Sequence, residues 1–177
     1  LGNDINTYSM ARAFYEEYKI KTVVIGKYPT GPSCNSKIID FILGKNLDKQ
    51  EVFIKIIKEI AERFSNKKLL LIGCGDNYVE LIIKNRELFN ANVIVPYIEE
   101  DLMQNLLTKE RFYEMCSQYK LDYPKTFIYN KTMNDSFDLP FDFPVILKPS
   151  NGIKYWENEF KGQKKVYRIK TRNELKR

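Results

Sequence analysis

Three short runs of apolar residues constrain the fold of this chain more than any other feature of its sequence. They are TVVIG at residues 22–26, LLLIG at 69–73 and NVIVP at 92–96, and each run ends at glycine or proline. Strands that are apolar on both faces, rather than at alternate positions, are typical of parallel sheets covered by helices on both sides. The sequence therefore predicts a parallel sheet within residues 1 to about 96.

Amphipathic helical patterns separate these runs, over residues 6–18, after Asp48 and Glu51, and over about 78–86. Asp48 and Glu51 have the spacing of a capping box, with aspartate in the usual Ser/Thr place. Strands that alternate with helices form βαβ units, so the expected class is α/β with a Rossmann-like parallel sheet. The side chains expected on the buried faces of the first two helices are Met10, Ala11, Phe14, Tyr18, Val52, Phe53, Ile56, Ile57, Ile60 and Phe64.

Two loops of small and polar residues follow expected strands, GNDIN at residues 2–6 and GCGDN at 73–77. Ligands of open parallel sheets bind beyond the carboxyl ends of the strands, so we expect the two loops to lie side by side and to form a substrate cleft. The alternative is that Gly and Asp only turn the chain and cap the next helix. The side chains expected to bind substrate are Asn3, Asp4, Asn6, Asp76 and Asn77.

The charge and hydropathy patterns argue against two classes of partner. The formal net charge is +6, but basic residues are interleaved with acidic ones, and only residues 161–177 are clearly basic. Without a recognition motif or a concentrated basic stripe, nucleic-acid binding is not expected. No stretch approaches the roughly 18 uninterrupted apolar residues of a membrane span, and no signal peptide is visible.

The cysteine and histidine contents limit the chemistry. Cys34, Cys74 and Cys116 are widely spaced, and the chain contains no histidine. A structural zinc site and a histidine base are therefore not expected, and reduced thiols of a cytoplasmic protein are the plain interpretation. The segment GCGDNY at 73–78 lacks the third glycine of a dinucleotide fingerprint, which argues against an NAD-dependent dehydrogenase.

Two lysines in the second half of the chain are candidate phosphate ligands. Thr108 is the expected N-cap of a helix that opens with Lys109, and a helix N-terminus with a lysine beside it attracts anions. Lys148 ends the apolar run FPVIL, and a cation at the end of a buried strand must either pair with an anion or reach solvent. The alternative for Lys109 is a solvated surface lysine.

The segments around these lysines complete the expected second region. A further strand is expected at 126–129 (TFIY), and an alternating run, KVYRIK, occupies 165–170. The polar residues 150–163, which include Gly152 and Gly162, are expected to be mobile and to cover a bound phosphate.

At these residues the chain resembles the ATP-grasp ligases. The pattern is a helix that opens with Lys109, then YPKT at 123–126, then FPVILKP at 143–149. Within that family the segments GNDIN at 2–6, ARAF at 11–14 and KYW at 154–156 are most similar to carboxylate–amine ligases of the D-aspartate ligase type.

The resemblance implies a pre-ATP-grasp α/β domain at 1–104 and the amino-terminal portion of an ATP-grasp domain at 105–177. It implies that Lys148, Lys109 and Ser150 contact ATP, and that ATP with Mg²⁺ converts a carboxylate to an acyl phosphate that an amine attacks. In that family the adenine-binding and magnesium-binding side chains lie beyond the region that corresponds to Arg177. No metal ligand is therefore expected in this chain, and the chain alone is expected to be inactive.

The two ends of the sequence suggest a piece of a longer protein. The chain opens at Leu1 with LGND, which resembles the exit of a strand, and closes on TRNELKR, where Thr171 could cap a further helix. The substrates implied by the resemblance are a peptidoglycan stem peptide and D-aspartate. A different class of function, a non-catalytic α/β module that binds a nucleotide or an amino acid, stays open.

Overall fold

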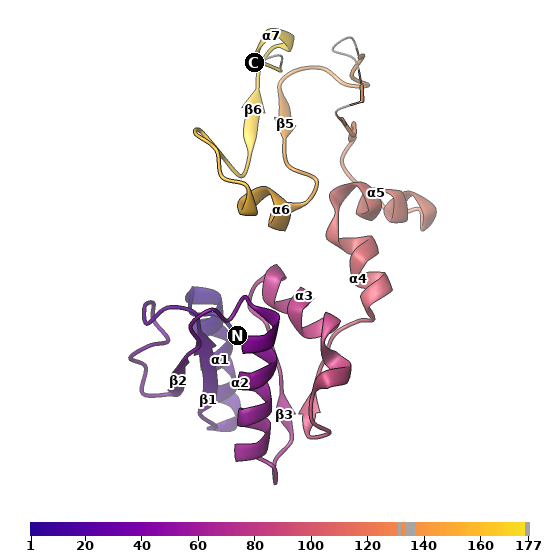
Figure 1. Cartoon of the computed structure of the whole chain (residues 1–177). Helices are drawn as coiled ribbons and strands as arrows, with labels where there is room; N and C mark the ends of the chain where they lie inside the picture. Colours follow the sequence, from indigo (N-terminus) through magenta and orange to yellow (C-terminus); the bar gives the residue numbers. More distant parts are fainter. Residues whose placement is uncertain (131, 134–136, 176–177) are drawn as a thin grey trace. The chain divides into compact units, whose positions relative to one another are not determined.

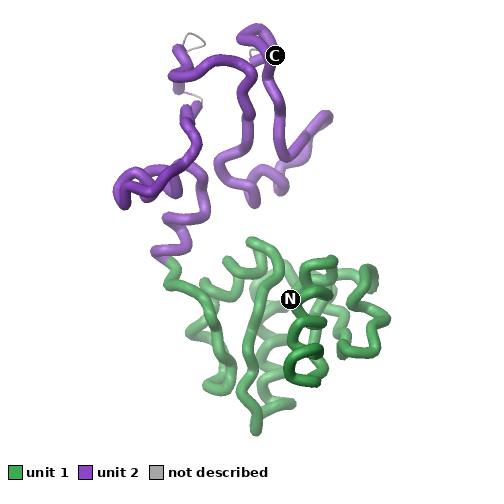
Figure 2. The backbone as a smooth tube through the Cα atoms, turned by 180° about the vertical axis from the view of Figure 1, so that it is seen from behind, with its two compact units in different colours: residues 1–100 green, residues 101–177 purple. Residues whose placement is uncertain are grey.

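The structure is a computed structural model, and it describes residues 1–130, 132–133 and 137–175. The chain divides into two compact units, Leu1–Glu100 and Asp101–Arg177, which Figure 2 shows in green and purple. The expected boundary fell at residues 104/105, and the identity of the two regions as a pre-ATP-grasp domain and part of an ATP-grasp domain remains a prediction.

The first unit alternates helices with short parallel strands (Figure 1). β1 pairs in parallel with β2, and β3 pairs in parallel with β4. The expected α/β class with parallel strand pairing is therefore confirmed. In chain order its elements are α1 (Ile5–Tyr18), β1 (Thr22–Gly26), β2 (Ile39–Leu43), α2 (Gln50–Arg63), β3 (Leu69–Leu70), α3 (Asp76–Lys84), the 3-10 helix η1 (Arg86–Leu88) and β4 (Val93–Ile94).

The first two residues of the chain join the two strand pairs. The Leu1 amino group donates to Ile72 O at 2.5 Å, and Cys74 N donates to Leu1 O at 3.0 Å. On the other side, Gly2 N donates to Ile25 O at 3.0 Å. The two bonds of Leu1 reach the residues before and after Gly73, which is the pattern of a parallel ladder. The resulting lateral order is β2, β1, residues 1–2, β3, β4.

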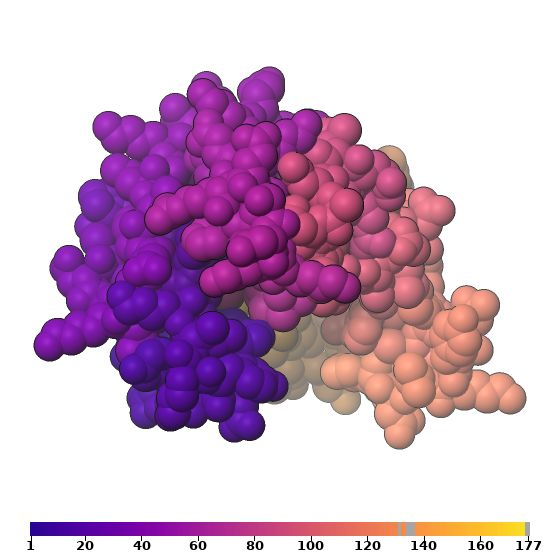
Figure 3. All heavy atoms as spheres, turned by 90° about the horizontal axis from the view of Figure 1, so that it is seen from below, coloured from indigo at the N-terminus to yellow at the C-terminus, as the bar shows by residue number. Residues whose placement is uncertain are grey.

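Neighbouring residues of β1 point to opposite faces of the sheet, and both faces carry apolar side chains. Helices therefore cover both faces. Val24 packs with Ala11 of α1 and with Ile39, whereas Ile25 packs in a separate cluster with the buried Phe53 of α2. In the space-filling view of Figure 3, atoms of this unit, indigo to magenta, pack closely, and long side chains project from the surface. The larger buried cluster consists of Leu1, Ile25, Leu47, Phe53, Ile57 and Ile82.

The strands differ from the expectation in two ways. β2 was not expected from the sequence, although Ile39 is buried within it. The runs at 69–73 and 92–96 form strands over only two residues each, and Leu70 and Ile94 are 47% and 42% exposed. The prediction that these two runs form strands buried on both faces was therefore wrong. The face of these runs that carries Leu70 and Ile94 reaches solvent in this unit.

The helices also required corrections. Only Ala11 of the expected α1 face is buried, together with Thr7, while Met10 and Tyr18 are exposed. Small side chains on the inner face allow α1 to lie close to the sheet. The capping box expected at Asp48 does not form: α2 has Lys49 at its N-cap position without a side-chain hydrogen bond. The carboxylate of Asp48 instead pairs with Lys27 at 3.0 Å.

The second unit contains four helices and one antiparallel strand pair among its described residues (Figure 1). β5 pairs with β6, with Val145 opposite Ile169. The expected N-cap is confirmed, since the Thr108 hydroxyl accepts a hydrogen bond from Arg111 N at 3.4 Å. The elements are α4 (Glu100–Leu107, which starts at the last residue of the first unit), α5 (Lys109–Gln118), β5 (Val145–Leu147), α6 (Gly152–Glu157), β6 (Tyr167–Ile169) and α7 (Arg172–Leu175).

Two strand expectations for this unit were wrong. Residues 126–129 have an irregular backbone, and the aromatic ring of Phe127 stacks on Phe137 with 5.1 Å between ring centroids. β5 was expected to be buried, yet Ile146 and Leu147 are 56% and 42% exposed. Among the described residues β5 has a ladder partner on one side only, so much of its apolar surface reaches solvent. The alternation at 165–170 correctly indicated β6.

In the part of the chain that the structure describes, no helix combines the length and the apolar character needed to cross a membrane.

The core of the first unit gives a direct test of the packing. Phe53 is fully buried and meets Phe89 edge-on with 5.8 Å between ring centroids. We expect Phe53→Ala to lower the free energy of unfolding by about 3–5 kcal/mol, because it leaves a cavity between α2 and the sheet. Urea unfolding followed by circular dichroism measures this change. Lys55→Ala on the same helix, whose side chain is 76% exposed, should change it by less than about 0.5 kcal/mol. Equal midpoints for wild type and Phe53→Ala would contradict the packing.

Candidate functional site

The carboxyl ends of the parallel strands in the first unit bring the two expected loops together. Leu1 O accepts the hydrogen bond from Cys74 N, and a Cβ built on Gly2 would lie 3.7 Å from Cys74 Cβ. The expected adjacency of residues 2–6 and 73–77 is therefore confirmed. The direction in which the chain adds strands also reverses here. From residues 1–2 the chain adds β1 and β2 on one side, and then β3 and β4 on the other side. Such a reversal is where open α/β sheets bind ligands.

Asp4 caps a helix. One carboxylate oxygen accepts hydrogen bonds from Thr7 N at 3.0 Å and from the Thr7 hydroxyl at 2.9 Å, and the other accepts one from Asn6 Nδ2 at 3.1 Å. Burial acts to raise the pKa of Asp4, but the hydrogen bonds from Thr7 and Asn6 outweigh it and hold the pKa below 3.8. The observed role of Asp4, supported by Asn6, is therefore the helix cap that the sequence allowed as an alternative. A contact of either side chain with substrate remains a prediction.

Asn3 links the first loop to the loop after β1. Its Nδ2 atom donates to the Thr30 hydroxyl at 3.2 Å and to Thr30 O at 3.4 Å. The neighbouring Gly31 has φ of 84°, and a Cβ at that position would lie 2.1 Å from Asn3 O. A side chain at residue 31 would therefore separate the two loops. Asn3 positions this edge of the sheet, whatever ligand it also contacts.

Asp76 and Asn77 occupy the first turn of α3, and both are exposed. The helix has Gly75 at its N-cap position and no side-chain cap. Among the described residues, neither Asp76 nor Asn77 has a side-chain hydrogen bond or ion pair. Of the five expected substrate residues, these two are the ones whose polar groups are left available by the surrounding structure.

Tyr97 fixes the exit of β3 and was not expected from the sequence. Its hydroxyl accepts a hydrogen bond from Gly73 N at 2.8 Å and donates to Gly73 O at 3.3 Å. Burial raises the pKa of Tyr97 above 10.0. A Cβ on Gly73 would lie 2.9 Å from Val79 N, so the absence of a side chain lets the strand exit approach α3 closely.

In the second unit a backbone hydrogen bond brings two of the expected nucleotide residues together. Lys109 N donates to Ser150 O at 3.1 Å. The first residue of α5 thus lies beside the segment that leaves β5 through Lys148. Lys148 is exposed, and among the described residues its ammonium group has no ion-pair partner. The structure therefore leaves this cation free to meet an anion.

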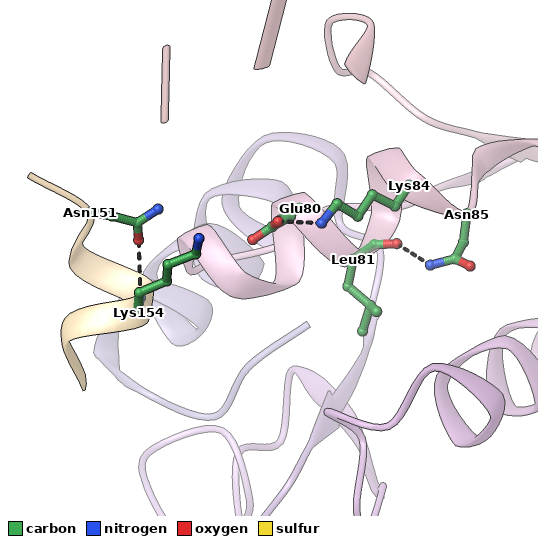
Figure 4. A network of polar contacts seen from close by, with 6 residues as sticks. All are labelled: Glu80, Leu81, Lys84, Asn85, Asn151 and Lys154. Atoms are coloured by element: carbon green, nitrogen blue, oxygen red, sulfur yellow. Dashed lines mark hydrogen bonds and ion pairs between the residues drawn. The ribbon is translucent and has the colours of Figure 1, made fainter. Parts of the chain in front are cut away.

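The segment expected to be a mobile cover has defined local structure. Asn151 caps α6 through a hydrogen bond from Lys154 N to Asn151 Oδ1 at 3.0 Å (Figure 4). The hydroxyl groups of Tyr155 and Tyr167 lie 2.9 Å apart, and Lys164 N donates to the Tyr167 hydroxyl at 2.9 Å. The turn between α6 and β6 is thereby tied to its own flanks. That it moves when a ligand binds remains a prediction.

An apolar cavity of about 210 Å³ lies elsewhere in the second unit. Its polar side chains are few, and Arg172 is already engaged by the Phe137 carbonyl and by Asp138. The lining consists of Phe127, Tyr129, Phe137, Leu139, Phe141, Val145, Ile146, Leu147, Arg172 and Leu175.

Within residues 1–130, 132–133 and 137–175, no group of three or more His, Cys, Asp or Glu side chains is placed to hold a metal ion.

Comparison with known proteins supports the resemblance seen in the sequence. The chain is 40% identical over 182 residues to a D-aspartate ligase from Enterococcus faecium (strain Aus0004). The match covers 99% of this chain and 43% of that ligase, so the chain spans less than half the length of this relative. Similarity to a ligase of the D-aspartate type is therefore confirmed. No protein-family model and no solved structure matches the chain.

The cap at Asp4 predicts a pH-dependent contribution to stability. A carboxyl whose pKa is lowered by folding stabilises the fold fully above its unfolded pKa, here 3.8, and loses that contribution as pH falls through the lowered value. We expect Asp4→Ala to lower the free energy of unfolding by about 0.5–2 kcal/mol at pH 7. The difference from wild type should shrink as the pH falls below 3.8. Denaturant unfolding at several pH values measures it.

Asp4→Asn is the matched control, because asparagine caps helices without a titratable group. Its difference from Asp4→Ala should stay nearly constant over the same pH range. An Asp4→Ala variant as stable as wild type at pH 7, or one whose deficit did not change down to pH 2, would contradict this role.

Proposed function

We propose that this chain forms the amino-terminal part of an ATP-dependent ligase that joins a carboxylate to an amine. The observation that carries the proposal is the hydrogen bond from Lys109 N to Ser150 O, together with the exposed Lys148 two residues earlier. In the ATP-grasp ligases, the two corresponding lysines contact the nucleotide. Similarity to a D-aspartate ligase over 99% of the chain supports the same class of reaction.

The roles of these residues follow from phosphate chemistry. Phosphoryl transfer depends on positioning and on electrostatic stabilisation more than on a protein nucleophile. Lys148 would contact the phosphates of ATP, with Lys109 at the edge of the same site and Ser150 beside it. The absence of histidine from the chain is compatible with this chemistry. ATP would supply the phosphoryl group that converts the carboxylate to an acyl phosphate, which the amine then attacks.

Magnesium would accompany ATP in such a reaction, and its side-chain ligands would come from another part of a full-length ligase. The described residues offer no acidic cluster of the kind that holds a divalent cation. Lys109, Lys148 and Ser150 would supply only the phosphate half of a nucleotide site. We therefore propose that the chain alone does not turn over ATP, and that a protein in which it is continued to the length of the ligase relative does.

The substrates and setting belong to the same proposal. The matched relative is named for D-aspartate, so we propose D-aspartate as one substrate and a peptidoglycan stem peptide as the other. The protein would then act in the cytoplasm, in the synthesis of cell-wall cross-bridges. The loop side chains that stay available at the edge of the first unit, Asp76 and Asn77, are the proposed substrate contacts among those expected from the sequence.

A second candidate is a non-catalytic module that binds an amino acid or a nucleotide. It is favoured by the first unit, which assembles the edge of a parallel sheet and its loops from residues 1–100 alone. Magnesium-dependent ATP turnover by the full-length protein separates the two, since the module would bind its ligand without consuming ATP.

Lys148 provides the test of the proposed function. In the full-length ligase, we expect Lys148→Met to weaken ATP binding about 10- to 100-fold, because a charge-assisted contact to phosphate contributes roughly 1.5–3 kcal/mol. Methionine keeps most of the apolar stem, so the fold should be retained. Calorimetric titration with ATP in the presence of Mg²⁺ measures the effect, and Lys148→Ala should lose about as much.

Lys58→Met is the matched control, because Lys58 is exposed on α2 in the other unit. It should bind ATP like wild type. If Lys148→Met and Lys148→Ala both bound and turned over ATP normally, Lys148 would be an ordinary surface lysine and the assignment to ATP would fail.

A further inference from the structure

An ion pair spans the carboxyl ends of two adjacent parallel strands in the first unit. Lys27 directly follows β1, and Asp48 lies in the turn between β2 and α2, with 3.0 Å between Lys27 Nζ and Asp48 Oδ1. The side chains are 31% and 51% exposed, so both charges remain accessible to a ligand. Neither charge is used to cap α2, whose N-cap position is Lys49.

One tyrosine ring lies beside this pair, and a second tyrosine stands in the first turns of α3. The Lys27 ammonium lies 5.7 Å from the centre of the Tyr28 ring. Tyr78, in the first turns of α3, packs against the larger core cluster and is half-buried. Burial raises the pKa of Tyr78, so its phenol stays protonated at neutral pH and can donate a hydrogen bond. Among the described residues its hydroxyl has no hydrogen-bond partner.

These groups lie next to the point where the strand order reverses. Lys27 and Asp48 follow β1 and β2, on one side of residues 1–2, and Tyr78 follows Gly73 on the other. Lys27, Asp48 and Tyr28 thus lie together at the edge where open α/β sheets bind small molecules, and Tyr78 lies at the same carboxyl edge beyond residues 1–2. The two strands also carry a comparison pair at their opposite end: Lys21 and Asp40, 3.3 Å apart, with side chains 52% and 61% exposed.

We propose that Lys27 and Asp48 bind a free α-amino acid, with Lys27 contacting its carboxylate and Asp48 its ammonium group, and with Tyr78 as a further hydrogen-bond donor. A simple anion at Lys27 would be repelled by the carboxylate of Asp48, and a simple cation at Asp48 by Lys27. A zwitterion meets both charges and exchanges one ion pair for two. Exposed ion pairs contribute little to stability, so opening this one costs little.

The inference deepens the proposed function and rests on it for its purpose, because the amino acid would be the amine or carboxylate substrate of the ligase. The binding itself needs neither ATP nor Lys148, so it can be measured separately. The relative's name makes D-aspartate the first probe.

The experiment is a titration of the ¹⁵N-labelled 177-residue chain, followed by amide chemical shifts. We expect D-aspartate and glycine to produce saturable shifts near Lys27, Asp48 and Tyr78. Succinate and inorganic phosphate, which lack an ammonium group, should produce no saturable shifts at these three residues, whatever they do near Lys148. Lys27→Met and Asp48→Asn should each weaken binding of D-aspartate at least 10-fold, while Lys27→Arg should retain most of it.

Lys21→Met and Asp40→Asn are the matched controls, since they remove the same charges from the same pair of strands at the opposite end. They should bind D-aspartate like wild type. Unfolding midpoints of all the variants establish that any loss is not a loss of fold. Tyr78→Phe, which keeps the buried ring, should weaken binding by a few-fold.

Three results would overturn the inference: no saturable shift with any amino acid, equal binding of succinate or phosphate at Lys27 and Asp48, or equal losses in the Lys21 and Asp40 controls. The first of these leaves the test of Lys148 with ATP unaffected, so the proposed function can stand without this site. Conversely, amino-acid binding at Lys27 and Asp48 with normal ATP turnover in Lys148→Met would uphold this site while the proposed nucleotide assignment fails.

Discussion

The first unit depends on the hydrogen bonds that Leu1 and Gly2 make to the strands on either side. Without them the unit would hold two separate two-stranded pairs, and an isolated pair of strands is marginally stable in water. The buried Leu1 side chain also belongs to the same core cluster as Ile25 and Phe53, so this residue contributes to the packing as well as to the strand ladder. The continuity across residues 1–2 also decides which loops become neighbours, because it places the exit of β3 beside the start of α1.

The sequence predicted the elements of this unit better than their lengths and partners. β1 was predicted correctly because its residues are apolar throughout, and Val24 and Ile25 are both buried on opposite faces. β2 was missed because Asp40 interrupts its apolar pattern, and its pairing with β1 is a long-range contact that no local signal reports. The strands at 69–73 and 92–96 were predicted too long. Their apolar runs continue through Leu71 and Val95, which pack against the core although they lie outside β3 and β4.

The candidate sites show the same limit. The adjacency of the loops at 2–6 and 73–77 could be predicted because parallel strands present their carboxyl ends together. The cap at Asp4 was one of the two alternatives that the sequence allowed for this loop, because capping is a local contact with Thr7. The bond from Asn3 to Thr30 could not be predicted, because it forms only when two loops far apart in the sequence meet. Lys27 and Asp48 were missed for a related reason: their contact requires the register between β1 and β2, and β2 itself was not expected.

The second unit separates its charged groups from its apolar surface, and this separation bears on where the proposed nucleotide's phosphates would be held. The cavity bounded by Phe127, Phe137 and Leu147 is walled by aromatic and aliphatic side chains. Its single cation, Arg172, already has the Phe137 carbonyl and Asp138 as partners. A phosphate placed there would be desolvated without a free donor to compensate, which is unfavourable. Lys148 lies beyond the end of the same strand pair and stays exposed, beside the Lys109–Ser150 hydrogen bond. Anion binding in this unit is therefore favoured at the end of β5 and disfavoured at the cavity.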